Sequence, residues 1–185
     1  MGILLSPKRR FDVPIYARCI TPDTFSTLSL SEILNLEVHE GNRKRKLKEL
    51  FEVSTGPYTS PEGFTIWMKG DFSKVRYIGY GMSTGKIVLE GVAGMHLGEE
   101  MKGGFIQVYG DAGSWVGSMM RGGKIEVFGD VGDYTGAAYR GSGRGMRGGE
   151  IIVHGNALNE TGCYMRGGLI KVYGCLLYTS PSPRD

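Results

Sequence analysis

Residues 101–111, MKGGFIQVYGD, decide the fold because their pattern returns along the chain. It recurs as MRGGKIEVFGD at 120–130, MRGGEIIVHGN at 146–156 and MRGGLIKVYG at 165–174, and a degenerate copy, MSTGKIVLEG, precedes them at 82–91. From Ile87 to Ile170 the repeated isoleucines are spaced by 19, 19, 26 and 19 residues. A fixed period of this length is the signature of a solenoid, in which each repeat is one structural unit.

Each repeat combines a short strand with glycine-rich corners. The I-x-V-x-G segment alternates apolar and polar residues, as a strand does when one face is buried. Paired glycines before the strand disfavour a helix and suit sharp turns. The second short apolar segments, 114–117 and 133–136, complete the unit. We therefore predict a mainly β chain, a right-handed parallel β-helix with coils of about 19 residues over 61–174.

Stacking of such coils assigns a place to each repeated residue. The isoleucines, valines and methionines fill the interior, each above its counterpart one coil away. The Arg or Lys beside each glycine pair points to solvent. The repeated methionines are accordingly a core column rather than a metal or redox site; they are Met82, Met101, Met120, Met146 and Met165.

Composition separates the N-terminal third from the repeats. Of the 31 glycines, 26 lie between Gly79 and Gly174. Residues 1–60 are predicted to form a small mixed cap or docking segment at one end of the solenoid. Within it, Ser29 and Glu32 match a capping box at a helix start, residues 49–53 fit a helix or a strand, and the basic run RKRK at 43–46 is flanked by glutamates that neutralise it.

The bulk properties limit the function. A net charge of +3 spread along the chain gives no footprint for nucleic acid. Three widely separated cysteines predict neither a zinc site nor an iron–sulfur cluster. With no signal peptide and no apolar run long enough for a bilayer, we expect a cytoplasmic protein that contacts no membrane.

Direct signs of chemistry are weak. Residues 143–148 match G-x-G-x-x-G, but a strand rather than a helix follows, so a dinucleotide site is not predicted. One Asp or Asn per coil is too few for a calcium-binding β-roll. His154 shares its slot with aromatic residues of other coils, which predicts a surface ring ladder. The slot of His96 holds Trp115, Tyr134 and Glu160 in other coils. This variability favours a surface position, and a catalytic base is the open alternative.

The 26-residue spacing marks an insert. Residues 137–145 loop out of one corner, with seven residues more than the other coils have there. Loops carried on rigid repeats commonly make functional contacts. Tyr139, Arg140 and Arg144 are therefore candidates for an interface or ligand contact, and a solvated loop is the alternative.

The repeats, the insert GAAYRGSGRGMRGG at 136–149 and the stretch FDVPIYARCITPDTF at 11–25 resemble the C subunit of formylmethanofuran dehydrogenase. They are also similar to the C subunit of bacterial formyltransferase/hydrolase complexes, and more distantly to the C-terminal β-helix of the glutamate synthase large subunit. The resemblance covers about residues 6–174. The tail 175–185, CLLYTSPSPRD, departs from it where another coil would follow and looks like a translated sequencing adapter, so a non-native end on a truncated subunit is expected.

The resemblance implies a noncatalytic structural subunit of an oxidoreductase complex that reduces CO2 and fixes it as formylmethanofuran. Molybdopterin or tungstopterin and iron–sulfur clusters are expected on partner subunits, one pterin-binding and one amidohydrolase-like. No catalytic, cofactor-binding or metal residue is expected in this chain itself. Arg140 and Arg144 would then contact a neighbouring subunit or the glutamate-bearing tail of methanofuran.

Two other functions remain open from the sequence. One is a stand-alone β-helical acyl- or formyltransferase that uses His96 or His154. The other is a glutamate-synthase-type module that only spaces other domains. The choice between molybdenum and tungsten, the host and the assembly stoichiometry are left open.

Overall fold

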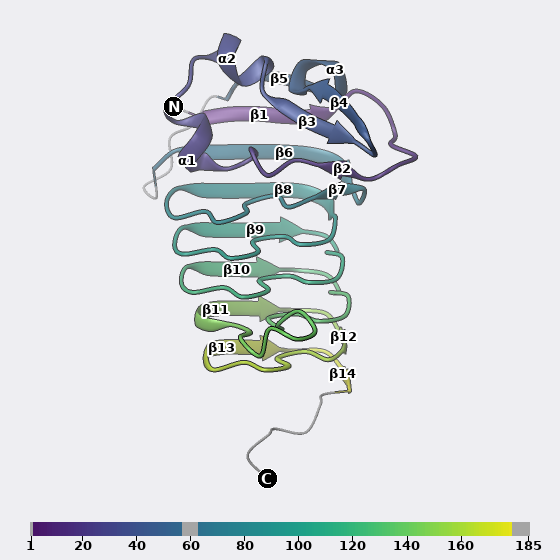
Figure 1. Cartoon of the computed structure of the whole chain (residues 1–185), viewed down its shortest axis with the longest axis vertical. Helices are drawn as coiled ribbons and strands as arrows, with labels where there is room; N and C mark the ends of the chain where they lie inside the picture. The colour runs from purple at the N-terminus through teal and green to yellow at the C-terminus, as the bar shows by residue number, and fades with distance from the viewer. Residues whose placement is uncertain (1, 57–62, 179–185) are drawn as a thin grey trace.

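The computed structural model describes residues 2–56 and 63–178, and it is mainly β, as predicted. Strands lie one beneath another along the long axis, and the chain returns to the same edge after each one (Figure 1). The eight-stranded sheet has the order β13-β11-β10-β9-β8-β6-β1-β5. Its repeat strands are β6 (Thr65–Phe72), β8 (Lys86–Ala93), β9 (Phe105–Tyr109), β10 (Lys124–Val127), β11 (Arg147–Val153) and β13 (Gly167–Val172).

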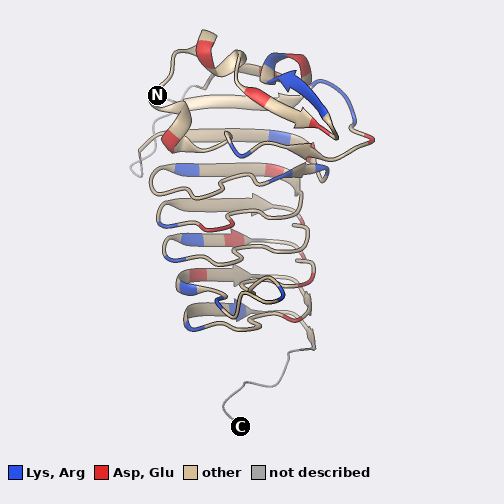
Figure 2. Cartoon of the chain, viewed as in Figure 1, with Lys and Arg blue, Asp and Glu red and all other residues tan. Residues whose placement is uncertain are grey.

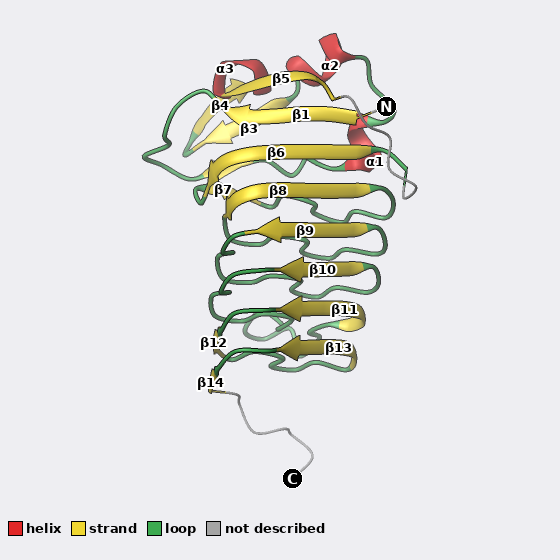
Figure 3. Cartoon of the chain, turned by 180° about the vertical axis from the view of Figure 1, so that it is seen from behind, coloured by secondary structure: helices red, strands yellow, loops and turns green. Residues whose placement is uncertain are grey.

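The repeat strands pair in parallel, and the repeated isoleucines stay in register; β11 and β13 show one register shift, between Arg147 and Glu150. Seen from behind, they form a continuous sheet along the molecule (Figure 3). Ile87 pairs with Ile106, which pairs with Ile125, and Ile125 pairs with Ile151 across the 26-residue spacing. The seven extra residues therefore leave the ladder unshifted, because they lie outside the sheet.

The predicted interior columns are confirmed. Met82, Met101, Met120 and Met146 are each at most 1% exposed, and the repeated isoleucines from Ile66 to Ile151 are fully buried. Met165 and Ile170 in the last coil are partly buried. The glycine at 123 is required by close packing: its φ is +84°, and a Cβ there would lie 2.8 Å from the backbone of Gly103.

The second short apolar segments of the coils are turns. They span residues 114–117 and 133–136, and the coil-to-coil β-bridges lie outside them, at Ala112, Val131 and Ala157. Within the turns, Trp115 and Tyr134 have φ of 68° and 63°. A left-handed residue cannot continue an extended strand.

The N-terminal segment packs on the first coil. β1 (Gly2–Pro7) pairs in parallel with β6 and antiparallel with β5 (Phe51–Gly56). A four-stranded sheet, β4-β3-β2-β7, contains β4 (Arg43–Lys46), β3 (Glu37–Glu40), β2 (Ile15–Tyr16) and β7 (Val75–Arg76). The predicted boundary at residue 60 lies outside the described residues.

Three short helices complete this segment: α1 (Pro22–Phe25), α2 (Leu30–Leu34) and α3 (Leu47–Leu50). The capping box of Ser29 and Glu32 is present, and residues 49–53 divide between α3 and β5. The basic strand β4 lies beside β3, whose ribbon carries acidic positions (Figure 2). Lys44 pairs with Glu37 at 3.1 Å and Arg45 with Glu40 at 3.1 Å, so local ion pairs partly neutralise the run.

At the other end, β12 (Ala157–Asn159) and β14 (Leu176–Tyr178) pair in parallel. Of the predicted non-native tail, residues 179–185 lie outside the described part of the chain. Within the described ranges, none of the helices has the length and apolarity that a membrane crossing requires.

Candidate functional site at the insert

A column of stacked rings runs down the side of the coils where the insert lies. Tyr77, His96, Trp115 and Tyr134 occupy equivalent positions in four successive coils. Their ring centroids are separated by 4.6, 6.1 and 4.3 Å, and neighbouring planes are within 12° of parallel. Stacked aromatic rings stabilise one another beyond the area that they bury.

All four residues of this ring column have left-handed backbones, with φ between 63° and 68°. Such a conformation costs a residue with a Cβ about 1–2 kcal/mol. The cost is met because the surrounding ladder fixes the backbone: the His96 N–H donates to the carbonyl of Ser114, and the Trp115 N–H donates to that of Asp133. Strain of this kind often accompanies functional sites.

A buried carboxylate joins the ring column to the insert. Oε2 of Glu99 lies 2.6 Å from Nδ1 of His96, and the hydroxyl of Tyr139 donates to the same oxygen at 2.6 Å. Tyr139 Oη also lies 3.1 Å from His96 Nδ1. Glu99 is 3% exposed and His96 is 7% exposed. The three groups form a compact, largely dry cluster.

The electrostatics favour a neutral tyrosine in this cluster. Burial, followed by the hydrogen bond and charge of Glu99, raises the pKa of Tyr139 well above its usual range. A neutral Tyr139 keeps its proton, and its hydroxyl donates a hydrogen bond to the carboxylate. The cluster therefore acts as a clamp that ties residue 139 to a coil two turns away.

The predicted site residues are separated by this arrangement. Tyr139 folds back onto Glu99, whereas Arg140 and Arg144 are exposed. The base of the insert is closed by a 2.8 Å hydrogen bond from the Met146 N–H to the carbonyl of Gly136. Of the three, only the two arginines are presented outward.

The surface position expected for His96 is wrong. Its ring is covered by Tyr77 on one side and by Trp115 and Tyr139 on the other. The sequence argument relied on variability at this slot, but four of its occupants, Tyr77, His96, Trp115 and Tyr134, are rings that stack on one another. The slot is thus variable and covered at once.

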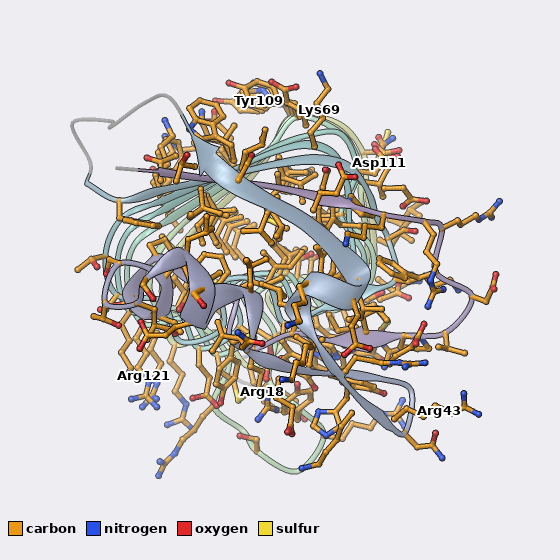
Figure 4. All side chains as sticks on the ribbon, turned by 90° about the horizontal axis from the view of Figure 1, so that it is seen from above. Arg18, Arg43, Lys69, Tyr109, Asp111 and Arg121 are labelled. Carbon is orange, nitrogen blue, oxygen red and sulfur yellow. The ribbon has the colours of Figure 1, made fainter. Side chains whose placement is uncertain are left out.

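His154 lies in the surface ring ladder that was predicted. It stacks on Phe128 at 4.6 Å and on Tyr173 at 5.3 Å, and Phe128 stacks on Tyr109. Its Nε2 lies 3.0 Å from Glu126, and this hydrogen bond is the main cause that lowers the pKa of that carboxyl. Viewed along the stack, Tyr109 lies on the side of the molecule opposite Arg18 (Figure 4).

The ring column continues toward the N-terminal segment. Tyr16 stacks on Tyr77 at 6.2 Å, and the guanidinium of Arg18 lies 4.5 Å from the ring centroids of Tyr77 and Tyr80. Such cation–π contacts link the cap to the coils.

His96 and His154 belong to different columns, so the structure does not bring the two candidate bases together.

Sequence reasoning missed Glu99. In the coils without the insert this slot lies two residues before the methionine, and it holds Tyr80, Ser118 and Cys163 in the other such coils. A carboxylate in a slot otherwise filled by uncharged residues was a usable signal, because an ionised group is buried only when it is hydrogen-bonded or paired.

These features define a repeat protein of stacked β coils with an insert that is hydrogen-bonded to an earlier coil through Tyr139. No family model matches the chain. Over 98 residues, 53% of its length, the chain is 50% identical to the C subunit of the molybdenum-containing formylmethanofuran dehydrogenase 1 of Methanothermobacter marburgensis. Over 96 residues, 52% of its length, it is 48% identical to the C subunit of the tungsten-containing formylmethanofuran dehydrogenase 2 of Methanothermobacter wolfeii.

A solved structure is similar over most of the chain. It is the formyltransferase/hydrolase complex from Methylorubrum extorquens in complex with methylofuran. The TM-score is 0.85 at 28% identity, and the match covers 93% of this chain and 63% of that one. The matched regions are 24% and 36% of the two curated relatives. The resemblance to the C subunit that the motifs indicated is confirmed.

Proposed function

We propose that the chain is a noncatalytic structural subunit of a formylmethanofuran dehydrogenase complex, which fixes CO2 as formylmethanofuran in the first step of methanogenesis from CO2. The observation that carries this proposal is the 50% identity to the C subunit of such an enzyme. A subunit of a bacterial formyltransferase/hydrolase complex is the alternative, supported by the similarity to that complex at 28% identity.

In this proposal the chemistry belongs to partner subunits in the cytoplasm. Molybdopterin or tungstopterin and iron–sulfur clusters would be held by a pterin-binding partner, and an amidohydrolase-like partner would act beside it. The clamp of Glu99, His96 and Tyr139 supports a structural role here, since Oε2 of Glu99, Nδ1 of His96 and the Tyr139 hydroxyl contact one another.

For the architecture, we propose a right-handed parallel β-helix over 61–174, a cap over 1–60 and a non-native tail from 175. Coil-to-coil contacts along the strands, at Ala112 and Val131, and down the ring column support the β-helix. Its hand is supported by the strong preference of parallel crossovers for a right-handed turn. An electron-density map of the chain would test the β-helix and the cap, and the gene sequence beyond codon 174 would test the tail.

Arg140 and Arg144 are proposed to contact a neighbouring subunit or a carboxylate-bearing ligand tail. Both are exposed on an insert that the clamp holds in place. Arginine recognises carboxylates through two parallel hydrogen bonds. A solvated loop remains the alternative.

Affinity purification of the chain from its host, with mass spectrometry and metal analysis, tests the proposal. Recovery of pterin-binding and amidohydrolase-like subunits with molybdenum or tungsten is expected. Recovery of a formyltransferase partner instead favours the alternative complex, and a chain that purifies alone contradicts both. The double variant Arg140→Ala/Arg144→Ala is expected to recover less partner than the control Arg43→Ala/Lys74→Ala does, or to have a higher KM for methanofuran. Values equal to those of the control would contradict the contact.

A stand-alone acyl- or formyltransferase is a second candidate, favoured by one observation. Glu99 holds Nδ1 of His96, which is how a carboxylate orients a catalytic imidazole. Transferase activity in the isolated chain that is lost in His96→Asn would support it. Absence of activity in the purified chain would leave the structural role.

A further inference from the structure

One corner of the coils carries a column of cations. Lys102, Arg121, Arg147 and Arg166 each follow an interior methionine, and all four are exposed. Their backbone N–H groups each donate to the methionine carbonyl one coil earlier, at 2.7–2.8 Å. The four residues therefore stack one above another, at the roughly 4.8 Å spacing of neighbouring strands. We call them the basic corner.

The basic corner lacks local neutralisation. Among the described residues, none of its four side chains forms an ion pair or hydrogen bond, whereas Lys171 on the adjoining sheet pairs with Glu150 at 3.2 Å. Viewed along the stack, Arg121 extends from a corner far from Asp111 (Figure 4). Like charges so close together repel, and an anion that spans them would relieve the repulsion.

Acidic residues gather at the opposite ends of the strands. Asp111 and Asp130 follow β9 and β10 in the sequence, and Figure 4 shows Asp111 on the side of the molecule away from Arg121. Glu150, three residues after Arg147 of the basic corner, is already paired with Lys171 and, at 3.9 Å, with Lys124. The corner is thus a positive edge on a chain whose net charge is only +3.

A carboxylate of the chain already docks at the top of this corner. Ser83 holds the position equivalent to Lys102 in the preceding coil, since both follow the repeated methionine. The Ser83 N–H donates to Oδ2 of Asp23 at 3.0 Å, and its hydroxyl donates to Oδ1. The position of Ser83, one coil before Lys102, is therefore already bound by the carboxylate of Asp23.

We propose that the basic corner is a docking surface for an acidic segment of a partner polypeptide. The segment runs along the coil axis and continues the position that Asp23 occupies. Alternate side chains of an extended peptide lie about 7 Å apart on one face, and the long arginine side chains adjust to that spacing from their closer backbone positions. The planar guanidinium of arginine forms two parallel hydrogen bonds to a carboxylate, and three of the four cations are arginines. This inference is independent of the proposed function, because it concerns the isolated chain.

The test uses a labelled peptide in which four glutamates alternate with serines, with binding followed by fluorescence anisotropy. The same peptide with glutamine for glutamate is the ligand control. For Arg121→Gln/Arg147→Gln we expect the Kd for the acidic peptide to rise about tenfold or more, since two charge-assisted contacts are lost. Arg43→Gln/Lys74→Gln removes the same net charge elsewhere, and we expect it to change the Kd less than about twofold.

Three results would overturn the proposal. They are equal binding of the glutamate and glutamine peptides, equal weakening by the two double variants, and binding of inorganic polyphosphate but not of the acidic peptide. Because the substituted side chains are exposed, the fold is expected to persist, and a thermal melt checks this. The single variants Lys102→Gln and Arg166→Gln, at the two ends of the column, provide a second measurement in which each is expected to weaken binding.

Discussion

The Tyr139 hydroxyl donates a 2.6 Å hydrogen bond to Glu99, although the two residues are 40 positions apart in the chain. This bond connects an insert that interrupts the repeat to a buried carboxylate in an earlier coil. Because Nδ1 of His96 lies 2.6 Å from the same oxygen, the carboxylate has partners on both sides. Through this bond the insert contacts the coil surface at Tyr139.

Removing the donor should loosen the insert. In Tyr139→Phe the ring remains and the hydrogen bond to a charged acceptor is lost, at a cost of about 1.5–3 kcal/mol to the closed insert. We expect trypsin to cleave after Arg140 and Arg144 at least about tenfold faster, because local opening governs cleavage of the native chain. Tyr164→Phe is the control, since that ring is 49% exposed. Equal cleavage of both variants would contradict the clamp.

The glycine at 123 should be irreplaceable for a steric reason. Gly123 and Gly141 have similar φ, +84° and +87°, but only at Gly123 would an added Cβ have backbone atoms within 4 Å. Alanine at 141 therefore pays only the left-handed penalty of about 1–2 kcal/mol. Alanine at 123 should lower the free energy of unfolding by clearly more, measured by urea denaturation. Similar losses at both sites would show that conformation alone matters.

The carboxylate of Asp130, which follows a repeat strand, should stabilise the stack of coils by accepting hydrogen bonds from the next coil. Oδ1 of Asp130 accepts from the backbone N–H of Asn156 at 2.6 Å and from its side-chain amide at 3.0 Å. Asp130→Ala should lower the free energy of unfolding by about 1 kcal/mol. Asp130→Asn keeps the acceptor and should cost much less. A loss for asparagine as large as that for alanine would point to charge rather than to hydrogen bonding.

Thiol reactivity should distinguish the cysteines. Burial raises the pKa of Cys19 from 9.0 to about 11, opposed by a smaller backbone hydrogen bond, whereas Cys175 is exposed. Since the thiolate is the reactive form, Cys19 should be alkylated at least about 100-fold more slowly than an exposed thiol at pH 8. Its rate should increase as the pH approaches 11. Mass spectrometry after iodoacetamide treatment measures both rates, and equal labelling would contradict the burial of Cys19.

The local pattern of the sequence predicted the repeating part of the fold. The period of 19 residues, the alternation around each isoleucine and the glycine pairs specify strands, corners and interior columns, because each depends on neighbours within one coil or at the same position of the next. The capping box at Ser29 is equally local and is present. The same locality let the resemblance to the C subunit be recognised from short motifs.

The tertiary structure alone decided where Tyr139 of the insert lies. A repeat pattern places residue 139 outside the ladder but says nothing of where its hydroxyl points, and the partner is Glu99, two coils away. The turns at Trp115 and Tyr134 likewise come from stacking that holds left-handed backbones in place. Periodicity determines which residues share a column. The contacts between columns depend on side-chain reach and packing in three dimensions, and these appear only once the coils are stacked.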